Sequence, residues 1–102
     1  MSDYVLSAHA EFDLDDIWEY IANDNLDAAD RWIETLFNAF SSIARTPGVG
    51  HKRGDLTDYP VLFWPVGAYL IIYRAERLPI EIVAVTQGSR DIPAFLNRCM
   101  RQ

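Results

Sequence analysis

The hydrophobic positions in the first half of the chain repeat with the period of an α-helix. Apolar side chains recur at spacings of three and four residues in two stretches, Ala10, Leu14, Ile17 and Ile21, then Ala29, Ile33, Leu36, Phe40 and Ile43. That spacing places each set on one face of a helix. Only the short polar break at residues 24–27 separates the two stretches. The pattern therefore predicts an antiparallel helical hairpin.

The ends of these helices are marked by capping and breaking residues. Ser7 is expected to cap the first helix, which runs to about Asn23, and Asp27 is expected to cap the second. Thr46-Pro47-Gly48 ends the second helix, because proline disfavours helical backbone before it and glycine suits the position after a helix. Residues 47–60 are rich in Gly, Pro, Asp and Thr and are expected to form a loop.

The second half of the chain changes to strand-like patterns. Three strands are expected at residues 61–66, 68–74 and 80–86, joined by short turns, and a further short strand at residues 4–7. Pro65 interrupts the first of the three, which suits an edge strand or a bulge. Tight turns between consecutive strands make these three antiparallel.

A last helix is expected to begin after Asp91, which can cap it, with Pro93 tolerated in its first turn. Its apolar side comprises Ile92, Phe95, Leu96 and Cys99. The predicted element order is thus β-α-α-β-β-β-α over one domain, residues 1–102. The fold class is α+β, a two-layer domain with the helical hairpin packed on a small, mainly antiparallel sheet.

Length and composition agree with an ordinary cytoplasmic domain. The chain has 102 residues, half of them hydrophobic and about a quarter charged, which fits one domain. Cys99 is the sole cysteine, so no intramolecular disulfide can form, as expected in a reducing cytosol. We interpret it as an unreactive thiol, because a reactive one would need a cationic neighbourhood. The N-terminus lacks a targeting segment and no apolar run could span a membrane, so a cytoplasmic location is expected.

Charge is unevenly distributed. The net charge is −6, but residues 1–34 carry ten acidic residues and one basic residue, whereas residues 35–102 carry five acidic and eight basic residues. Two interpretations remain open: two solvated faces, or a partner-binding surface in the basic half. The acidic total argues against direct sequence-specific nucleic-acid binding, which depends on neutralising phosphates.

The sequence indicates no metal or cofactor site. His9 and His51 lie in different segments without a cysteine or glutamate at ligand spacing, and each is expected to face solvent. A cluster of carboxylates in the first helix is assigned to its exposed face: Asp13, Asp15, Asp16 and Glu19. We expect no cofactor.

An ordered series of segments resembles a known family. The segments are residues 4–7, 13–21, 50–53, 55–57, 63–66, 69–74, 80–83 and 88–91, which include Gly50-His51-Lys52-Arg53, Phe63-Trp64-Pro65-Val66 and Gly88-Ser89-Arg90-Asp91. Over nearly the whole length this series resembles ParE-like toxins of the RelE/ParE superfamily.

The resemblance implies a toxin of a type II toxin–antitoxin system. Such a toxin is neutralised by a cognate ParD-like antitoxin, which has a ribbon-helix-helix part and a tail helix that fills an apolar groove on the toxin. ParE members inhibit DNA gyrase by protein–protein contact, whereas RelE members cut mRNA in the ribosome.

The choice between these branches depends on chemistry. RNA cleavage needs a group that transfers a proton and cations that stabilise the phosphorane. One such arginine, Arg90, remains. The other positions that correspond to these groups in relatives carry neither a cation nor a base: Leu62, Leu70 or Tyr69, Ala84, Gln87, Phe95 and Leu96. We therefore expect a gyrase-binding toxin and not an enzyme. The alternatives are a ribosome-dependent mRNA endonuclease using Arg74 and Arg90, and an inactive antitoxin-binding remnant.

Five residues are the candidate contacts with the target or the antitoxin: Arg53, Trp64, Arg74, Arg90 and Asp91. Each also has a structural interpretation. Arg53 and Arg74 could be solvated arginines, and Trp64 could belong to the core or line a groove. Asp91 could serve only as a helix cap, with Arg90 paired to it or to Glu81.

Overall fold

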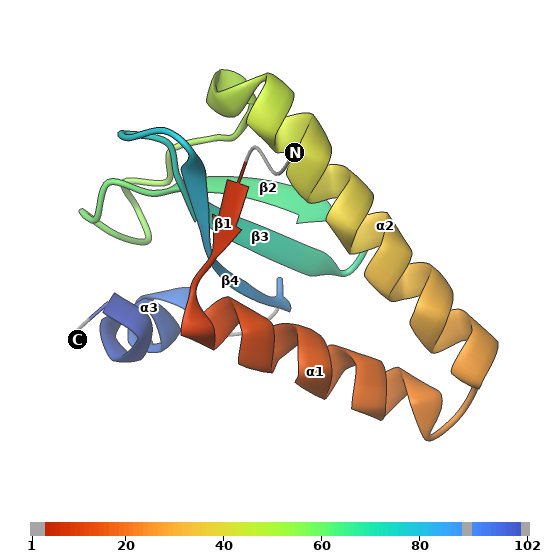
Figure 1. The fold of residues 1–102 in the computed structure, drawn as a ribbon. Helices are drawn as coiled ribbons and strands as arrows, with labels where there is room; N and C mark the ends of the chain where they lie inside the picture. The colour runs from red at the N-terminus through yellow and green to blue at the C-terminus, as the bar shows by residue number, and fades with distance from the viewer. Residues whose placement is uncertain (1–3, 89–90, 101–102) are drawn as a thin grey trace.

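The structure is a computed structural model that describes residues 4–88 and 91–100 (Figure 1). Its elements are β1 (Tyr4–Leu6), α1 (Ala8–Ala22), α2 (Leu26–Arg45), a 3-10 turn η1 (Pro47–Val49), β2 (Leu62–Val66), β3 (Tyr69–Arg74), β4 (Ile80–Gln87) and α3 (Ile92–Met100). The predicted order and every predicted helix and strand are confirmed. Within the described ranges, no helix is both long and apolar enough to cross a membrane.

The four strands form one sheet in the order β1-β4-β3-β2. β2–β3 and β3–β4 are antiparallel, and β1 adds to β4 in parallel, with Tyr4 opposite Ile80 and Leu6 opposite Ile82. The sheet is therefore mainly antiparallel, as predicted. Pro65 lies in β2, an edge strand, where a residue without a backbone N–H is tolerated.

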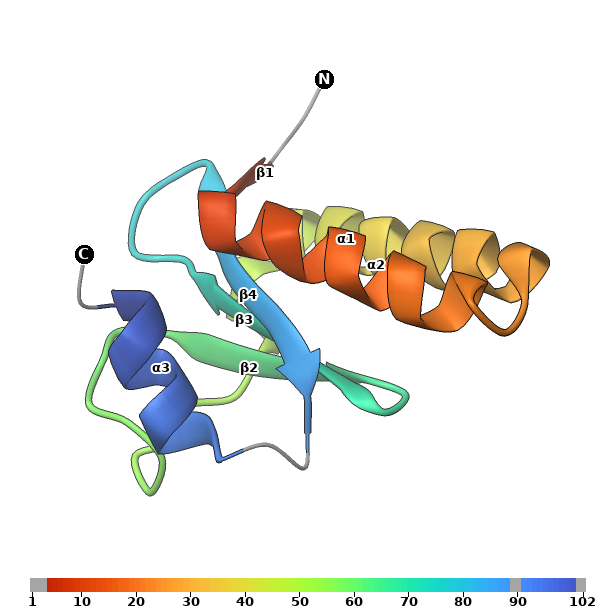
Figure 2. The same cartoon turned by 90° about the horizontal axis from the view of Figure 1, so that it is seen from below.

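The helical hairpin covers one face of the sheet, as the fold class requires (Figure 2). Leu36, Phe40 and Ile43 of α2 are fully buried against a cluster that includes Ile71 and Ile82 of the sheet. The α+β prediction is confirmed. The structure adds that α3 and the loop before β2 cover the opposite face.

A bulge in β4 changes which of its side chains point toward the helical hairpin and which point toward α3. Ile72 pairs with Ala84 but Tyr73 pairs with Ile82, so Val83 is an extra residue. Val83 and Ala84 consequently both belong to the cluster under α3, whereas Ile82 and Val85 belong to the cluster under the hairpin. The sequence shows this only as an unbroken apolar run.

Capping explains where the helices begin. Ser7 caps α1, as predicted, because its Oγ accepts a hydrogen bond from Ala10 N at 3.0 Å. The prediction that Asp27 caps the second helix is wrong. Asn25 adopts the extended conformation, and its Oδ1 accepts from Ala28 N at 2.9 Å. The helix therefore starts earlier and Asp27 lies in its first turn, where its charge favours the helix dipole.

β1 ends before β4 does. Beyond that point, side chains and not another strand form hydrogen bonds with the backbone groups along this edge of β4. Ser7 Oγ donates to Val83 O at 2.7 Å, and Asp13 Oδ2 accepts from Val85 N at 2.9 Å. Asp13 is consequently half-buried, with a side chain that is 14% exposed. The expectation that Asp13 lies on the exposed face is wrong, whereas Asp15 and Asp16 are exposed as expected.

His9 also departs from expectation. It was expected to face solvent, but its ring is half-buried and contacts side chains on both of its nitrogens: Nδ1 lies 3.1 Å from Asp13 Oδ2 and Nε2 lies 3.3 Å from Cys99 Sγ. The ring also packs edge-on against Phe95. The reason is that α3 folds back against the start of α1, a long-range contact that the sequence pattern does not reveal.

Tyr73 fixes the start of the long loop to the sheet. Its hydroxyl donates to Pro47 O at 2.7 Å and accepts from Gly50 N at 2.8 Å. Burial raises the pKa of Tyr73, although the bond from Gly50 acts in the opposite direction. A Cβ at Gly50 would lie 2.5 Å from this hydroxyl, so only glycine permits the approach.

Candidate protein-interaction surface

The four predicted contact residues that the structure describes come from different segments: Arg53 from the loop before β2, Trp64 from β2, Arg74 from the end of β3 and Asp91 from the start of α3. Arg53 is exposed in the loop before β2 and holds Asp55 through two hydrogen bonds, Nε to Oδ1 at 3.0 Å and Nη2 to Oδ2 at 2.8 Å. The pairing raises the pKa of Arg53 and lowers that of Asp55. An exposed ion pair of this kind contributes little to stability, so the guanidinium can exchange this partner for another one.

Trp64 lies on the edge strand β2, half-buried against the cluster beneath the helical hairpin. Its ring stacks on that of His51, with centroids 6.1 Å apart and planes 23° apart. His51 is exposed, as expected, and is held by two backbone hydrogen bonds with Phe63. Trp64 thus packs on the core with one side and on an exposed imidazole with the other.

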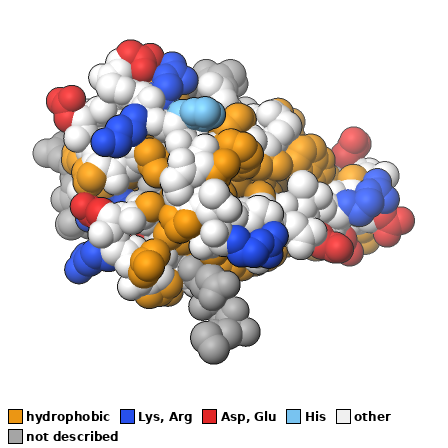
Figure 3. Space-filling model, turned by 90° about the horizontal axis from the view of Figure 1, so that it is seen from above, with side chains coloured by type: hydrophobic (Ala, Val, Ile, Leu, Met, Phe, Trp, Pro, Cys, Tyr) orange, Lys and Arg blue, Asp and Glu red, His pale blue; other side chains and the backbone are white. Residues whose placement is uncertain are grey.

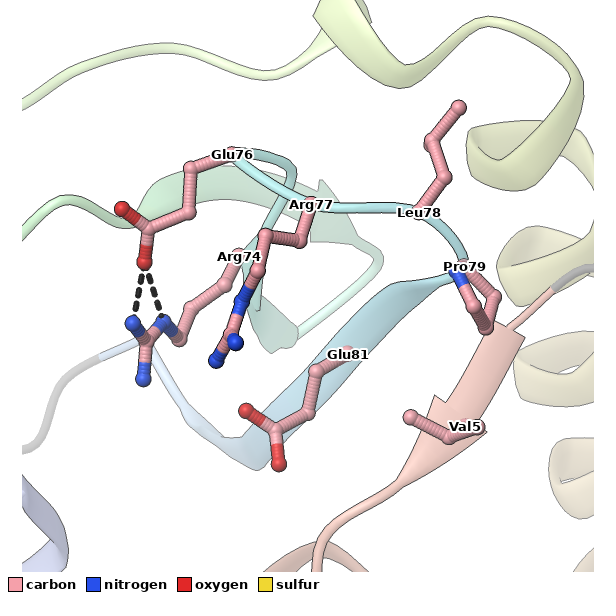
Figure 4. Close-up of a pocket in the computed structure, with 7 residues that line it drawn as sticks. All are labelled: Val5, Arg74, Glu76, Arg77, Leu78, Pro79 and Glu81. Atoms are coloured by element: carbon pink, nitrogen blue, oxygen red, sulfur yellow. Dashed lines mark hydrogen bonds and ion pairs between the residues drawn. The ribbon is translucent and has the colours of Figure 1, made fainter.

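Arg74 ends β3 beside a hollow of about 330 Å³. Its Nε donates to Glu76 Oε1 at 2.8 Å, and Nη2 pairs with the same oxygen. Figure 4 shows Arg77 extending from the β3–β4 turn between Arg74 and Glu81, while Leu78 points away. The residues that line the hollow are Val5, Arg74, Glu76, Arg77, Leu78, Pro79 and Glu81.

Sequence reasoning missed Arg77 and Leu78. Leu78 is 78% exposed, the largest value among the exposed large hydrophobic side chains of the described residues. The sequence feature that could have indicated them is an apolar residue beside a cation, Leu78 after Arg77, inside a predicted turn where neither is needed for packing. Leu78 and the exposed Val5 both line this hollow, so uncovered apolar area lies beside two arginines.

Asp91 acts as the predicted cap of α3. Its Oδ1 accepts a hydrogen bond from Ala94 N at 3.2 Å, and its backbone carbonyl accepts from Phe95 N at 3.0 Å. The side chain remains exposed. Arg90, with its predicted pairing to Asp91 or Glu81, lies outside the described residues.

A groove runs along the outer side of the helical hairpin and encloses about 370 Å³. Apolar side chains from β1, α1 and α2 line it, and two carboxylates stand among them: Leu6, Leu14, Trp18, Ile33 and Phe37, with Glu11 and Asp15. Trp18 is held in place because its Nε1 donates to Asp30 Oδ1 at 2.9 Å. We call this feature the hairpin groove.

Further apolar side chains remain uncovered. The exposed large ones are Val5, Phe12, Tyr20, Leu26, Phe37 and Leu78. The space-filling view shows hydrophobic side chains gathered over the middle of one face and along the helical arm, with charged side chains mostly toward its margins (Figure 3). Such patches on a small protein indicate contact with a partner.

Comparison with known proteins identifies the family. Residues 4–92 match the family model described as the ParE toxin of the type II toxin–antitoxin system parDE. The chain belongs to this ParE toxin family. No curated protein matches the chain. A solved structure, titled "Chromosomal ParDE TA system from P. aeruginosa", contains a chain with the same fold: the TM-score is 0.71 at 16% identity, covering 85% of this toxin and 96% of that chain.

In this toxin, the positions that lack the reactive groups of a ribonuclease lie in different environments. Ala84 is fully buried in the cluster that contains Phe95 and Leu96 of α3, and Leu70 is half-buried against the same cluster. Leu62 packs under the helical hairpin instead. Gln87 is exposed at the end of β4. Of these positions in the ParE toxin, Ala84, Phe95 and Leu96 are buried, Leu62 and Leu70 are half-buried, and Gln87 is exposed.

Among residues 4–88 and 91–100 of the toxin, no three histidine, cysteine, aspartate or glutamate side chains are grouped to hold a metal ion. The two histidines lie apart, His9 at the start of α1 and His51 beside β2.

Proposed function

We propose that this toxin acts in the cytoplasm by binding DNA gyrase through protein–protein contact, without catalysing a reaction, and that a ParD-like antitoxin neutralises it. The observation that carries this proposal is the apolar packing of Leu70 and Ala84 beneath α3. Phosphoryl transfer requires cations and a proton-transferring group at the reacting phosphate. A surface-contact mechanism requires neither.

The hairpin groove is the proposed antitoxin site. Its apolar lining of Leu14, Ile33 and Phe37 suits the apolar face of an amphipathic helix, which anchors through residues spaced three and four apart. Glu11 and Asp15 at the groove favour a segment that carries lysine or arginine beside its apolar residues. The strongly acidic N-terminal third of the chain adds to this attraction.

The hollow at the end of β3 is the proposed gyrase-binding surface. Arg77 and the exposed Leu78 combine a cation with uncovered apolar area, and Arg74 is half-buried there in a pair with Glu76, while Glu81 lines the same hollow. These features suit an acidic patch on the target with an apolar centre. Arg53, Trp64, Arg90 and Asp91 remain proposed contacts of the target or the antitoxin.

Induction of the chain in a growing bacterium tests the function. We expect growth arrest with induction of the DNA-damage response, because a poisoned gyrase leaves broken DNA. Co-expression of the ribbon-helix-helix protein encoded next to the toxin gene should restore growth. Arg77→Ala with Leu78→Ala should weaken the arrest without preventing this rescue.

The same experiment separates the alternatives. Codon-specific cuts in translated mRNA that disappear in Arg90→Ala would overturn the proposal in favour of a ribosome-dependent endonuclease. Unchanged growth at full protein level, combined with antitoxin binding, would identify an inactive remnant.

A further inference from the structure

A cysteine, a histidine and an aspartate from the two ends of the chain form one hydrogen-bonded series. Cys99 Sγ of α3 lies 3.3 Å from His9 Nε2, and His9 Nδ1 lies 3.1 Å from Asp13 Oδ2. The thiol and the carboxylate therefore contact opposite nitrogens of one imidazole. A nucleophile beside a base that a third group orients is the arrangement by which proteins activate thiols.

The imidazole is held in this orientation from three sides. Phe95 packs edge-on against it, with ring centroids 5.3 Å apart and planes at 85°. Asp13 is itself fixed, because its Oδ2 also accepts a hydrogen bond from Val85 N at 2.9 Å. The carboxylate cannot turn away without leaving a β4 amide unsatisfied. The tautomer with its proton on His9 Nδ1 would donate to this carboxylate and leave Nε2 as the acceptor for the thiol proton.

The thiol opens onto a small pocket. The pocket encloses about 210 Å³ at the junction of α1, β4 and α3. It is lined by Ser7, Ala8, His9, Arg74, Glu81, Val83, Cys99 and Met100. Arg74, which is paired with Glu76, brings a positive charge to the same pocket and favours a thiolate, while Glu81 opposes it. Among the described residues, the charged groups that line the pocket are Arg74 and Glu81, with Asp13 behind the imidazole.

We propose that Cys99 is an activated thiol, with His9 as its proton acceptor and Asp13 as a positioning residue, and that it is a modification site for hydroperoxides and other small electrophiles. The proposal concerns a different part of the molecule from the hairpin groove and does not depend on gyrase binding. The pocket volume of about 210 Å³ admits a small molecule to the sulfur.

The reaction with hydrogen peroxide balances within the pocket. The Cys99 proton moves to His9 Nε2, and the thiolate sulfur attacks one peroxide oxygen. An S–O bond forms, the O–O bond breaks, and the leaving hydroxide takes the proton from His9 to become water. Sulfur is oxidised by two electrons to sulfenic acid and the peroxide is reduced. Because the chain has no second cysteine, any disulfide that follows joins Cys99 to a thiol of another molecule.

The rate of Cys99 alkylation by iodoacetamide tests the proposal, and the single cysteine makes the label site-specific. The urea-unfolded chain supplies the reference for an ordinary thiol. At pH 6 we expect the folded protein to react about tenfold faster or more, since an unperturbed thiol is almost wholly protonated there. The ratio of the folded rate to the unfolded rate should fall as the pH rises toward 9, because the thiol of the unfolded chain also ionises there.

Variants assign the roles. His9→Gln should lower the folded rate at pH 6 about tenfold, and Asp13→Asn should shift the pH profile, which a merely structural carboxylate would not do. After peroxide treatment, a dimedone adduct should form on Cys99 and be absent from Cys99→Ser. A folded rate at pH 6 at or below the unfolded reference would overturn the proposal, and this comparison needs no variant to fold. An unchanged rate in folded His9→Gln would overturn it as well.

Discussion

Phe37→Asp is expected to abolish neutralisation by the antitoxin while leaving the toxin folded. Phe37 is 37% exposed and lines the hairpin groove, so a carboxylate there would be buried by the antitoxin helix without a partner. We expect binding to weaken about 100-fold or more, as for the anchors of protein interfaces, where each tenfold corresponds to about 1.4 kcal/mol. Titration calorimetry with the purified antitoxin measures the loss.

Phe12→Asp is the matched control. Phe12 also lies on the helical hairpin and is 69% exposed, but it does not line the groove. It should bind the antitoxin within about threefold of the unaltered toxin, as expected for a residue outside the interface. Equal weakening by both substitutions would mean that the antitoxin binds elsewhere or responds only to charge. Thermal unfolding of each variant verifies that the fold is retained.

Phe40→Ala is expected to give the largest loss of stability. Phe40 is fully buried and packs edge-on against Tyr4 of β1 and Phe37 of α2, with centroid distances of 5.5 and 5.6 Å. Truncation leaves a cavity where α2 meets the sheet, which lowers the free energy of unfolding by about 3–5 kcal/mol. That is a large share of the roughly 5–15 kcal/mol that holds a domain of this size.

The same substitution at Phe12 supplies the comparison. Because Phe12 is exposed, Phe12→Ala should change the free energy of unfolding by no more than about 0.5 kcal/mol. Urea unfolding measured by circular dichroism gives both values. Similar values for the two variants would contradict the assignment of Phe40 to the junction between the hairpin and the sheet.

The regular part of this fold could be predicted because it depends on local pattern. Leu36, Phe40 and Ile43 of α2 repeat with the helical period, and all three are fully buried between the hairpin and the sheet. Proline and glycine after Arg45 end α2 where expected. Capping was harder, since Asn25 and Asp27 are both good caps and only the backbone geometry distinguishes them.

The contacts between distant segments could not be predicted in the same way. Cys99 and His9 are 90 positions apart, and their contact depends on where α3 packs against the sheet. Asp13 resembled its exposed neighbours in sequence, but β1 ends before β4 does, and Asp13 binds the amide left open. The hairpin groove likewise combines Leu6, Trp18 and Phe37, which come from three elements.

The ribonuclease question shows where sequence and structure reinforce each other. The sequence showed Leu70 and Ala84 at positions where cations would be needed, which left open a site assembled from other residues. The structure places Ala84 fully buried in the cluster under α3, and Leu70 half-buried against that cluster. A phosphate could reach Ala84 only if its cover moved away, at the cost of exposing buried apolar area.

Supercoiling of relaxed plasmid by purified DNA gyrase tests the central claim most directly. Added toxin should inhibit supercoiling and increase the amount of cleaved plasmid trapped in gyrase–DNA complexes, and equimolar antitoxin should reverse both effects. Arg77→Ala with Leu78→Ala should require a higher toxin concentration for the same inhibition. Full supercoiling activity and no increase in cleaved plasmid at saturating toxin, with a protein that binds its antitoxin normally, would contradict the proposal.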